Sequence, residues 1–334
     1  MNNPEKTIAT PLLEIRKLSL RYDKQKHLAV DRVSLSINPG SSLGLVGASG
    51  AGKSSIARAI VRLIEPDSGE VRFNGKNITT MDSQQLAAIR QRVQLVFQDP
   101  VVSLSPRRTV EQTLLEPLQH FAIGNTNDRN NRIREILATV GLQDNALGRF
   151  PHQFSSGQQQ RIAIARALVT NPDLLIADEA VSSLDVSIQA QILQLLQELQ
   201  SKFGISILFI SHDLAVIRQI ADNVAVMYQG QLLEQSPADQ FFSQPAHPYS
   251  QTLLAIAKGI TPASWPGKQW QLERSHEMDD KSSSCVFAGF CPDKMDVCAR
   301  KEPALLDIQY NKQHTLDKHC VKCHLYEEVN TDDH

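Results

Sequence analysis

The sequence predicts an α/β fold, on three observations. A glycine-rich loop at residues 47–54 directly follows an apolar run at 42–46, and a helical pattern comes next. A second apolar run, at 174–177, ends in the acidic pair Asp178 and Glu179. Strand-length apolar runs then alternate with helical periodicity as far as residue 210. Together these features indicate a largely parallel sheet with helices on it and polar side chains at the carboxyl ends of its strands.

Apolar spacing, together with turn residues such as Asn38-Pro39-Gly40, predicts the strands and helices along the chain. Strands are expected at 12–20, 33–37, 42–46, 70–73, 93–97, 174–177 and 205–210. Helices are expected at 55–63, 158–169 and 187–202. From 109 to 147 apolar residues recur at spacings of three and four, which predicts a helical insert.

The loop at 47–54 reads Gly-Ala-Ser-Gly-Ala-Gly-Lys-Ser and fills every fixed position of the phosphate-loop pattern. Its glycines let backbone amides converge on phosphate oxygens, Lys53 supplies charge to the β and γ phosphates, and Ser54 offers a magnesium ligand. A nucleoside triphosphate with Mg²⁺ is therefore the expected ligand, above a helix N-terminus. The binding residues would be Gly47, Ala48, Ser49, Gly50, Ala51, Gly52, Lys53, Ser54 and Ser55.

The acidic pair suits hydrolysis of that ligand. Hydrolysis needs neutralised phosphates, an in-line water and a group that takes the proton of the water, and a carboxylate beside a metal supplies the last. The strand at 205–210 ends at Ser211-His212-Asp213. We expect both strand ends and the loop to meet in one crevice. The alternative is that Asp178 and Glu179 only cap the end of their strand.

Composition excludes some partners. The chain has 334 residues, 41% of them apolar, with a formal net charge of -2 and a pI near 6.6. Such a balance creates no global field that draws the chain to nucleic acid, so no nucleic-acid partner is expected. Residues 1–10 are polar and lack an apolar signal region, and no uncharged apolar stretch reaches the roughly 18 residues of a spanning helix. A cytoplasmic chain is expected unless a membrane partner holds it.

The order of these motifs resembles an ATP-binding-cassette ATPase. The residues that carry the resemblance are the phosphate loop, Gln98, Phe154-Ser155-Ser156-Gly157-Gln158, the run 174–179, Ser183-Leu184-Asp185 and His212. Further segments are similar to the ATPase subunits of oligopeptide and dipeptide (peptide/nickel) importers: 103–107, Glu116-Pro117-Leu118, His247-Pro248-Tyr249 and a cysteine-bearing tail. The resemblance runs from residue 12 to residue 326.

The resemblance implies the architecture of a phosphate-loop nucleoside triphosphatase. Residues 12–256 would form the nucleotide-binding domain, with a RecA-like core, an antiparallel β subdomain and an α-helical subdomain at about 101–158. Residues 257–334 would form a small cysteine-rich C-terminal domain.

The resemblance also implies roles for single residues. Glu179 would be the general base, His212 would contact the γ-phosphate, and Gln98 would contact Mg²⁺ or the attacking water. Ser54, Gln98 and Asp178 would hold Mg²⁺. Tyr22 would lie against adenine, although a half-buried surface tyrosine is an equal alternative. The remaining nucleotide contacts would come from Ser155, Ser156, Gly157 and Gln158, which close on the nucleotide of a partner subunit, and from Asp185 in a loop linking the two sites.

Two residues depart from the family pattern. Ser156 stands where the family has glycine, so it weakens the site completed on the partner or donates a hydrogen bond there. Ala180 stands where proline commonly follows the catalytic glutamate, which should loosen the turn. Neither change removes a catalytic group of this chain.

All five cysteines lie in the last fifty residues, at Cys285, Cys291, Cys298, Cys320 and Cys323. In a reducing cytoplasm, clustered thiols are metal ligands more often than disulfides. The resemblance makes Cys285, Cys291, Cys298 and Cys323 the ligand set and Cys320 an extra thiol. The intervals of six and seven residues favour a structural [4Fe–4S] cluster. Zinc, or reduced thiols without metal, are the alternatives.

The sequence thus predicts the ATP-hydrolysing motor of a di- or oligopeptide importer, peripheral on the cytoplasmic face of the inner membrane. Its partners would be a second homologous ATPase subunit in a heterodimer, two transmembrane permease subunits and, indirectly, a periplasmic or extracellular solute-binding protein. Alternatives are import of nickel or another solute, a soluble cassette protein of repair or translation, and a regulatory subunit that binds ATP without turnover. The single phosphate loop argues against repair and translation, and Glu179 argues against the regulatory subunit.

Overall fold

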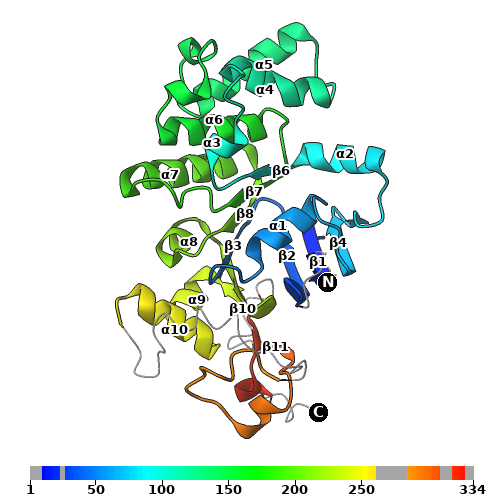
Figure 1. The fold of residues 1–334 in the computed structure, drawn as a ribbon, viewed down its shortest axis with the longest axis vertical. Helices are drawn as coiled ribbons and strands as arrows, with labels where there is room; N and C mark the ends of the chain where they lie inside the picture. Colours follow the sequence, from blue (N-terminus) through cyan, green and yellow to red (C-terminus); the bar gives the residue numbers. More distant parts are fainter. Residues whose placement is uncertain (1–9, 23–26, 261–283, 309–317, 328–334) are drawn as a thin grey trace, which may run out of the picture. The chain divides into compact units, whose positions relative to one another are not determined.

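The computed structural model describes residues 10–22, 27–260, 284–308 and 318–327. Its chain forms two compact units, each built from separated stretches of sequence (Figure 1). Unit 1 comprises Met1–Leu18, Ser34–Ser42 and Ala57–Leu208. Unit 2 comprises Ser19–Val33, Leu43–Ile56 and Phe209–His334. The predictions made for residues 1–9 and for much of 257–334 fall outside the described residues.

Unit 1 holds most of a four-stranded sheet with the order β2-β1-β4-β5. The strands are β1 (Leu13–Leu20), β2 (Val30–Ile37), β4 (Ser68–Phe73) and β5 (Lys76–Asn77). Strands β4 and β5 pair antiparallel. The strands expected at 12–20, 33–37 and 70–73 are therefore confirmed, although β2 begins three residues earlier than its apolar run suggested.

Unit 1 also contains parallel strands with helices around them. Strand β6 (Val93–Val96) pairs parallel with β7 (Leu174–Asp178), and β7 lies next to β8 (Ser206–Ile210). The helices of this unit are α2 (Ser83–Arg92), α3 (Pro100–Ser103), α4 (Val110–His120), α5 (Thr126–Thr139), α6 (Ser156–Leu168) and α7 (Val186–Phe203), with short 3₁₀ turns η1 (Asp144–Ala146) and η2 (Pro151–Gln153). Helices α4, α5 and α6 lie together as one group (Figure 1).

The helical insert is confirmed, and its helix starts have local causes. The Thr109 hydroxyl accepts a hydrogen bond from the Gln112 amide, and the Gln112 side-chain oxygen accepts one from the Thr109 amide. Asn125 and Asp128 form the same pair of bonds at the start of the next helix. These reciprocal caps satisfy amides that the first helical turn leaves unpaired. The apolar positions of α4 and α5 turn inward and pack on α6.

Unit 2 contains the strand that leads into the phosphate loop. Strand β3 (Ser42–Gly47) pairs parallel with β9 (Asn223–Tyr228), and β9 pairs antiparallel with β10 (Gln231–Pro237). Two short tail strands, β12 (Cys320–Lys322) and β11 (Leu305–Asp307), continue this sheet beyond β10. The helices are α1 (Lys53–Ile60), which begins in this unit, α8 (Leu214–Ile220), α9 (Ala238–Ser243) and α10 (Pro248–Ala257), with 3₁₀ turns η4 (Asp296–Ala299) and η5 (His324–Tyr326).

A separate cysteine-rich domain is not confirmed, because the described tail is built into unit 2. The carboxylate of Glu234, on β10, is fully buried and accepts hydrogen bonds at 2.8 Å from the Ala246 and His247 amides. The same carboxylate lies 2.8 Å from Nε2 of His319, just before β12. These three contacts offset the cost of removing the carboxylate from water. The contact with His319 fixes the tail strand beside β10.

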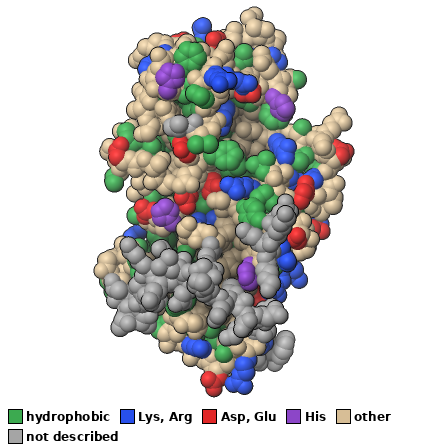
Figure 2. Space-filling view, viewed as in Figure 1, with side chains coloured by type: hydrophobic (Ala, Val, Ile, Leu, Met, Phe, Trp, Pro, Cys, Tyr) green, Lys and Arg blue, Asp and Glu red, His purple; other side chains and the backbone are tan. Residues whose placement is uncertain are grey.

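Positive and negative side chains are interspersed on the face seen in Figure 2, in keeping with the small net charge. Within the described residues, none of the helices combines the length and apolar character needed to cross a bilayer.

Candidate nucleotide site

The phosphate loop in unit 2 has a shape that requires glycine at its first position. Gly47 ends β3 with φ at 150°, and a Cβ on it would lie 2.1 Å from the carbonyl oxygen of Met227 on β9. Any other residue would collide with backbone of the neighbouring strand, so the loop leaves the sheet through a gap that only glycine fits.

Lys53 is buried, with 4% of its surface exposed, and its ammonium is folded into the loop. Its Nζ donates hydrogen bonds to the carbonyl oxygens of Gly47 at 2.8 Å and Ala48 at 2.9 Å. The helix begins at Lys53 rather than at residue 55, so the amides of Lys53 and Ser54 belong to its first turn. A buried cation and a helix N-terminus together make a strong site for an anion.

Tyr22 lies at the far end of the loop. Its hydroxyl is 3.0 Å from Oγ of Ser55, which is buried on the first turn of α1. The structure thus places an aromatic ring beside the loop, and the contact with adenine stays a prediction.

In unit 1 the acidic pair ends β7 in a tight turn. Asp178 is the last residue of the strand and is 7% exposed. Glu179 is half-buried and has φ at +50°, a left-handed conformation that residues other than glycine rarely adopt. The Ser182 amide and hydroxyl both donate to the Glu179 carbonyl, at 3.1 and 3.0 Å, and hold this conformation in place. Such backbone outliers cluster at active sites and ligand-binding sites.

Ser182 also connects the acidic turn to Gln98. The exposed Gln98 follows β6, and its Nε2 donates to Oγ of Ser182 at 3.4 Å. Sequence reasoning missed Ser182, since a lone serine in a turn carries no pattern. The structure therefore brings Gln98 and Glu179 to one hydroxyl.

Asp185 begins the next helix, α7. Its carboxylate accepts hydrogen bonds from the Ser187 hydroxyl at 2.6 Å and the Ile188 amide at 3.0 Å. These bonds, that from Ser187 foremost, hold the pKa of Asp185 below its ordinary value. The residue thus acts here as a helix cap, and its role in linking two sites stays a prediction.

The segment 154–158 forms the N-terminus of α6. Ser155 is its cap and exchanges hydrogen bonds with Gln158, and both side chains are exposed. Ser156 is the first helical residue, so a serine fits there without backbone strain. Gly157 is required by packing, since a Cβ on it would lie 2.5 Å from Cγ2 of Ile188. The segment offers an exposed helix N-terminus suited to an anionic group.

His212 follows β8 in unit 2 and is exposed. It lies between Ser211, whose amide donates to the Leu45 carbonyl of β3 at 3.2 Å, and Asp213, which caps α8. Unit 2 thus carries Tyr22, the loop and His212, whereas unit 1 carries Gln98, the acidic turn, the start of α6 and Asp185. That the two sets meet in one crevice stays a prediction.

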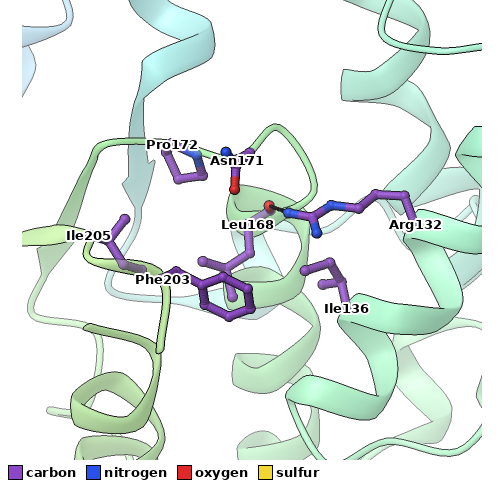
Figure 3. Close-up of a pocket in the computed structure, with 7 residues that line it drawn as sticks. All are labelled: Arg132, Ile136, Leu168, Asn171, Pro172, Phe203 and Ile205. Carbon is purple, nitrogen blue, oxygen red and sulfur yellow. Dashed lines mark hydrogen bonds between the residues drawn. The ribbon is translucent and has the colours of Figure 1, made fainter. Parts of the chain in front are cut away.

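A small cavity in unit 1 is not the nucleotide site. Figure 3 shows its lining, in which the guanidinium of Arg132 donates to the Leu168 carbonyl at 3.2 Å. The other lining residues are Ile136, Asn171, Pro172, Phe203 and Ile205. Its volume of about 10 Å³ holds about one water molecule, whereas ligand pockets measure several hundred Å³.

The five cysteines differ in their electrostatic neighbours. After burial, Cys285, Cys291 and Cys298 are the groups that raise the pKa of Cys323. Besides burial, the pKa of Cys320 is raised by Asp307 and lowered by Lys318. Burial raises the pKa of Cys291 and of Cys323 to about 11, and it raises the pKa of Cys285 as well.

The expected [4Fe–4S] cluster is nevertheless not supported. In the part of the chain that the structure describes, no three His, Cys, Asp or Glu side chains are arranged to hold a metal ion.

Comparison with known proteins identifies the family of the chain. Residues 30–182 match the model of the ABC transporter family, and residues 233–298 match the C-terminal region of oligopeptide/dipeptide transporters. The chain therefore belongs to the ABC transporter family, in the group of ATP-binding proteins that carry this C-terminal region.

Individual relatives narrow the group. The oligopeptide transport ATP-binding protein AppF of Bacillus subtilis is 41% identical over 302 residues, covering 89% of each chain. A putative peptide import ATP-binding protein of Brucella ovis is also 41% identical, over 90% of this chain and 95% of its own. Among solved structures, a dimeric post-hydrolysis state of the ATP-binding cassette MJ0796 with ADP and Pi has a TM-score of 0.62 and 29% identity, covering 68% of this chain and 98% of its own.

Proposed function

We propose that the protein is the ATP-binding and ATP-hydrolysing subunit of an ABC importer for di- or oligopeptides. The observation that carries the proposal is the phosphate loop with its buried Lys53, in a chain 41% identical to peptide-transport ATP-binding proteins over most of its length. The same relatives favour an importer over a protein of repair or translation.

The proposed chemistry assigns a task to each group. Loop amides and Lys53 bind the phosphates, and Tyr22 lies against the adenine. Ser54, Gln98 and Asp178 would hold Mg²⁺, which would supply positive charge against the phosphate charge that develops during hydrolysis. Glu179 accepts a proton from the attacking water, while His212 contacts the γ-phosphate. The left-handed backbone of Glu179, directly after β7, supports this assignment, because such conformations cluster at active sites.

The proposed assembly has a second, homologous ATPase subunit. The exposed start of α6, with Ser155, Ser156 and Gln158, would close on the nucleotide that this partner holds. The helix capped by Ser155 supplies amides for that contact without a charged side chain. A heterodimer follows if Ser156 makes the two composite sites unequal.

Two transmembrane permease subunits would bind unit 1 at the cytoplasmic face of the membrane. Val102, on α3, is 84% exposed, a large apolar side chain left in water. Nearby in sequence, an open groove of about 850 Å³ is lined by residues that include Arg107, Arg108 and Glu116, and Arg108 pairs with Glu116. Apolar and charged groups of this kind suit a short helix from a membrane subunit. A solute-binding protein would act on the far side and deliver the peptide.

The proposal is tested by purifying the tagged chain from membranes and identifying the copurifying proteins by mass. Two polytopic proteins and a second cassette subunit are expected, and the genes for these partners would point to peptide, nickel or another solute as cargo. Recovery of ribosomes or nucleic acid without membrane proteins would contradict the proposal.

A further inference from the structure

We propose that Tyr249, on helix α10, is a positioning residue for the phosphate loop and makes nucleotide affinity depend on the cysteine-bearing tail. This inference rests on the proposed function, because it concerns the affinity of the same loop for ATP. Tyr249 lies outside the loop by some two hundred residues of sequence, and no phosphate-binding pattern includes it.

Tyr249 contacts the phosphate loop at the peptide unit between Gly47 and Ala48. The Ala48 amide donates to the hydroxyl oxygen of Tyr249 at 3.3 Å. At the other end of that peptide, the Gly47 carbonyl accepts from Nζ of Lys53 at 2.8 Å. The peptide is thus fixed from both sides. Loss of the hydroxyl would free the plane of this peptide, and with it the carbonyl that holds the phosphate-binding ammonium in place.

Tyr249 is itself held rigidly by its surroundings. Its side chain is fully buried, and its ring lies 4.7 Å from the ring of Tyr228, on the strand next to β3. Its amide donates to Nδ1 of His247 at 2.9 Å at the start of α10. These contacts fix the Tyr249 hydroxyl before ATP binds. ATP binding therefore carries no entropy cost for ordering this side chain.

The cysteine-bearing tail contacts the Tyr249 ring through Phe287. Phe287 is 2% exposed and lies two residues after Cys285. Its ring meets Tyr249 at 5.3 Å in an edge-to-face arrangement, and it also contacts the rings of Tyr228 at 5.6 Å and His247 at 5.9 Å. Phe287 therefore holds the back of the ring whose hydroxyl holds the loop. A tail that withdraws Phe287 would release Tyr249.

The test is the affinity of the purified full-length chain for Mg-ATP, measured with a fluorescent ATP analogue. Tyr249→Phe keeps the ring and removes only the hydroxyl. We expect a dissociation constant roughly 3- to 10-fold higher, the usual cost of one hydrogen bond. The matched control is Tyr326→Phe, which removes a hydroxyl that donates to the Ala246 carbonyl at 3.1 Å. Its affinity should stay within twofold of the wild type.

A second variant keeps the proposal testable if Tyr249→Phe folds poorly. Phe287→Leu leaves the hydroxyl in place and removes its support, so ATP affinity should again fall, and the double variant should lose less than the product of the two single losses. Wild-type affinity in either single variant would overturn the inference, as would equal losses in Tyr249→Phe and Tyr326→Phe. A wild-type chain that binds no ATP would instead refute the proposed function.

Discussion

Acidification should loosen the start of α10, because His247 is buried in its neutral form. His247 is 1% exposed, and its Nδ1 accepts the Tyr249 amide, which requires that this nitrogen carry no proton. Burial lowers the pKa of His247 to about 4, from the ordinary 6.5. The unfolded chain therefore binds a proton between pH 6.5 and 4 that the folded chain does not. Stability contributed by this residue is present above pH 6.5 and is lost as the pH falls.

The size of the effect follows from these two pKa values. Between pH 7 and pH 5 the unfolded His247 becomes almost fully protonated while the folded one stays neutral, which costs about 2 kcal/mol, or roughly a factor of 20 to 30. The pKa of Glu234 is also lowered: burial alone would raise it, but the bonds from His319, Ala246 and His247 outweigh burial. The stability that Glu234 contributes is likewise lost as the pH falls, below the ordinary glutamate pKa of 4.5.

The assay is amide hydrogen exchange of α10, followed by mass spectrometry and corrected for the intrinsic pH dependence of exchange. Protection in the wild type should fall by roughly a factor of 20 to 30 from pH 7 to pH 5. The control is His247→Asn, because asparagine can still cap the helix but does not titrate. Its protection should change far less over the same range. Equal pH dependence in both proteins would refute the reasoning.

Two substitutions in unit 1 test the geometry of the candidate site. Gly157→Ala places a methyl group 2.5 Å from Cγ2 of Ile188 and should destabilise the chain by about 1–3 kcal/mol, measured by thermal unfolding. Gly148→Ala is its control, since nothing lies within 4 Å of the added atom, and equal effects would contradict the packing argument. Ser182→Ala removes the hydroxyl that bonds the Glu179 carbonyl and should lower kcat roughly 3- to 10-fold with little change in KM for ATP. An unchanged kcat would show that the turn does not need this hydroxyl.

Much of the chain up to residue 210 could be predicted, because its strands and helices carry strong local patterns. The run 174–177 is apolar and ends in two acids, and the structure places it as the buried strand β7. The start of α1 was placed two residues late, because Lys53 and Ser54 serve both the loop and the first turn of the helix. The motif residues lie at strand and helix ends as expected, and their chemical roles stay predictions.

The strands and helices after residue 213 were not predicted, for two different reasons. Strand β9 (Asn223–Tyr228) contains an apolar run, at 224–228, as clear as that of β7, so the signal was present and was missed. The tail strand β12 has three residues and pairs with β10, where Cys320 faces Gln235. Pairing across such a sequence distance leaves no local periodicity. The polar support of Glu234 and the contact of Tyr249 with the loop are likewise visible only after folding.

The central claim is that this chain hydrolyses ATP with Glu179 as the general base. The most direct measurement is steady-state ATP hydrolysis by the membrane assembly that copurifies with the chain, for the wild type and for Glu179→Gln. The account predicts a rate lower by about 100-fold or more when hydrolysis at the partner's site is silenced in both, with ATP binding retained. A rate that Glu179→Gln leaves unchanged would contradict it.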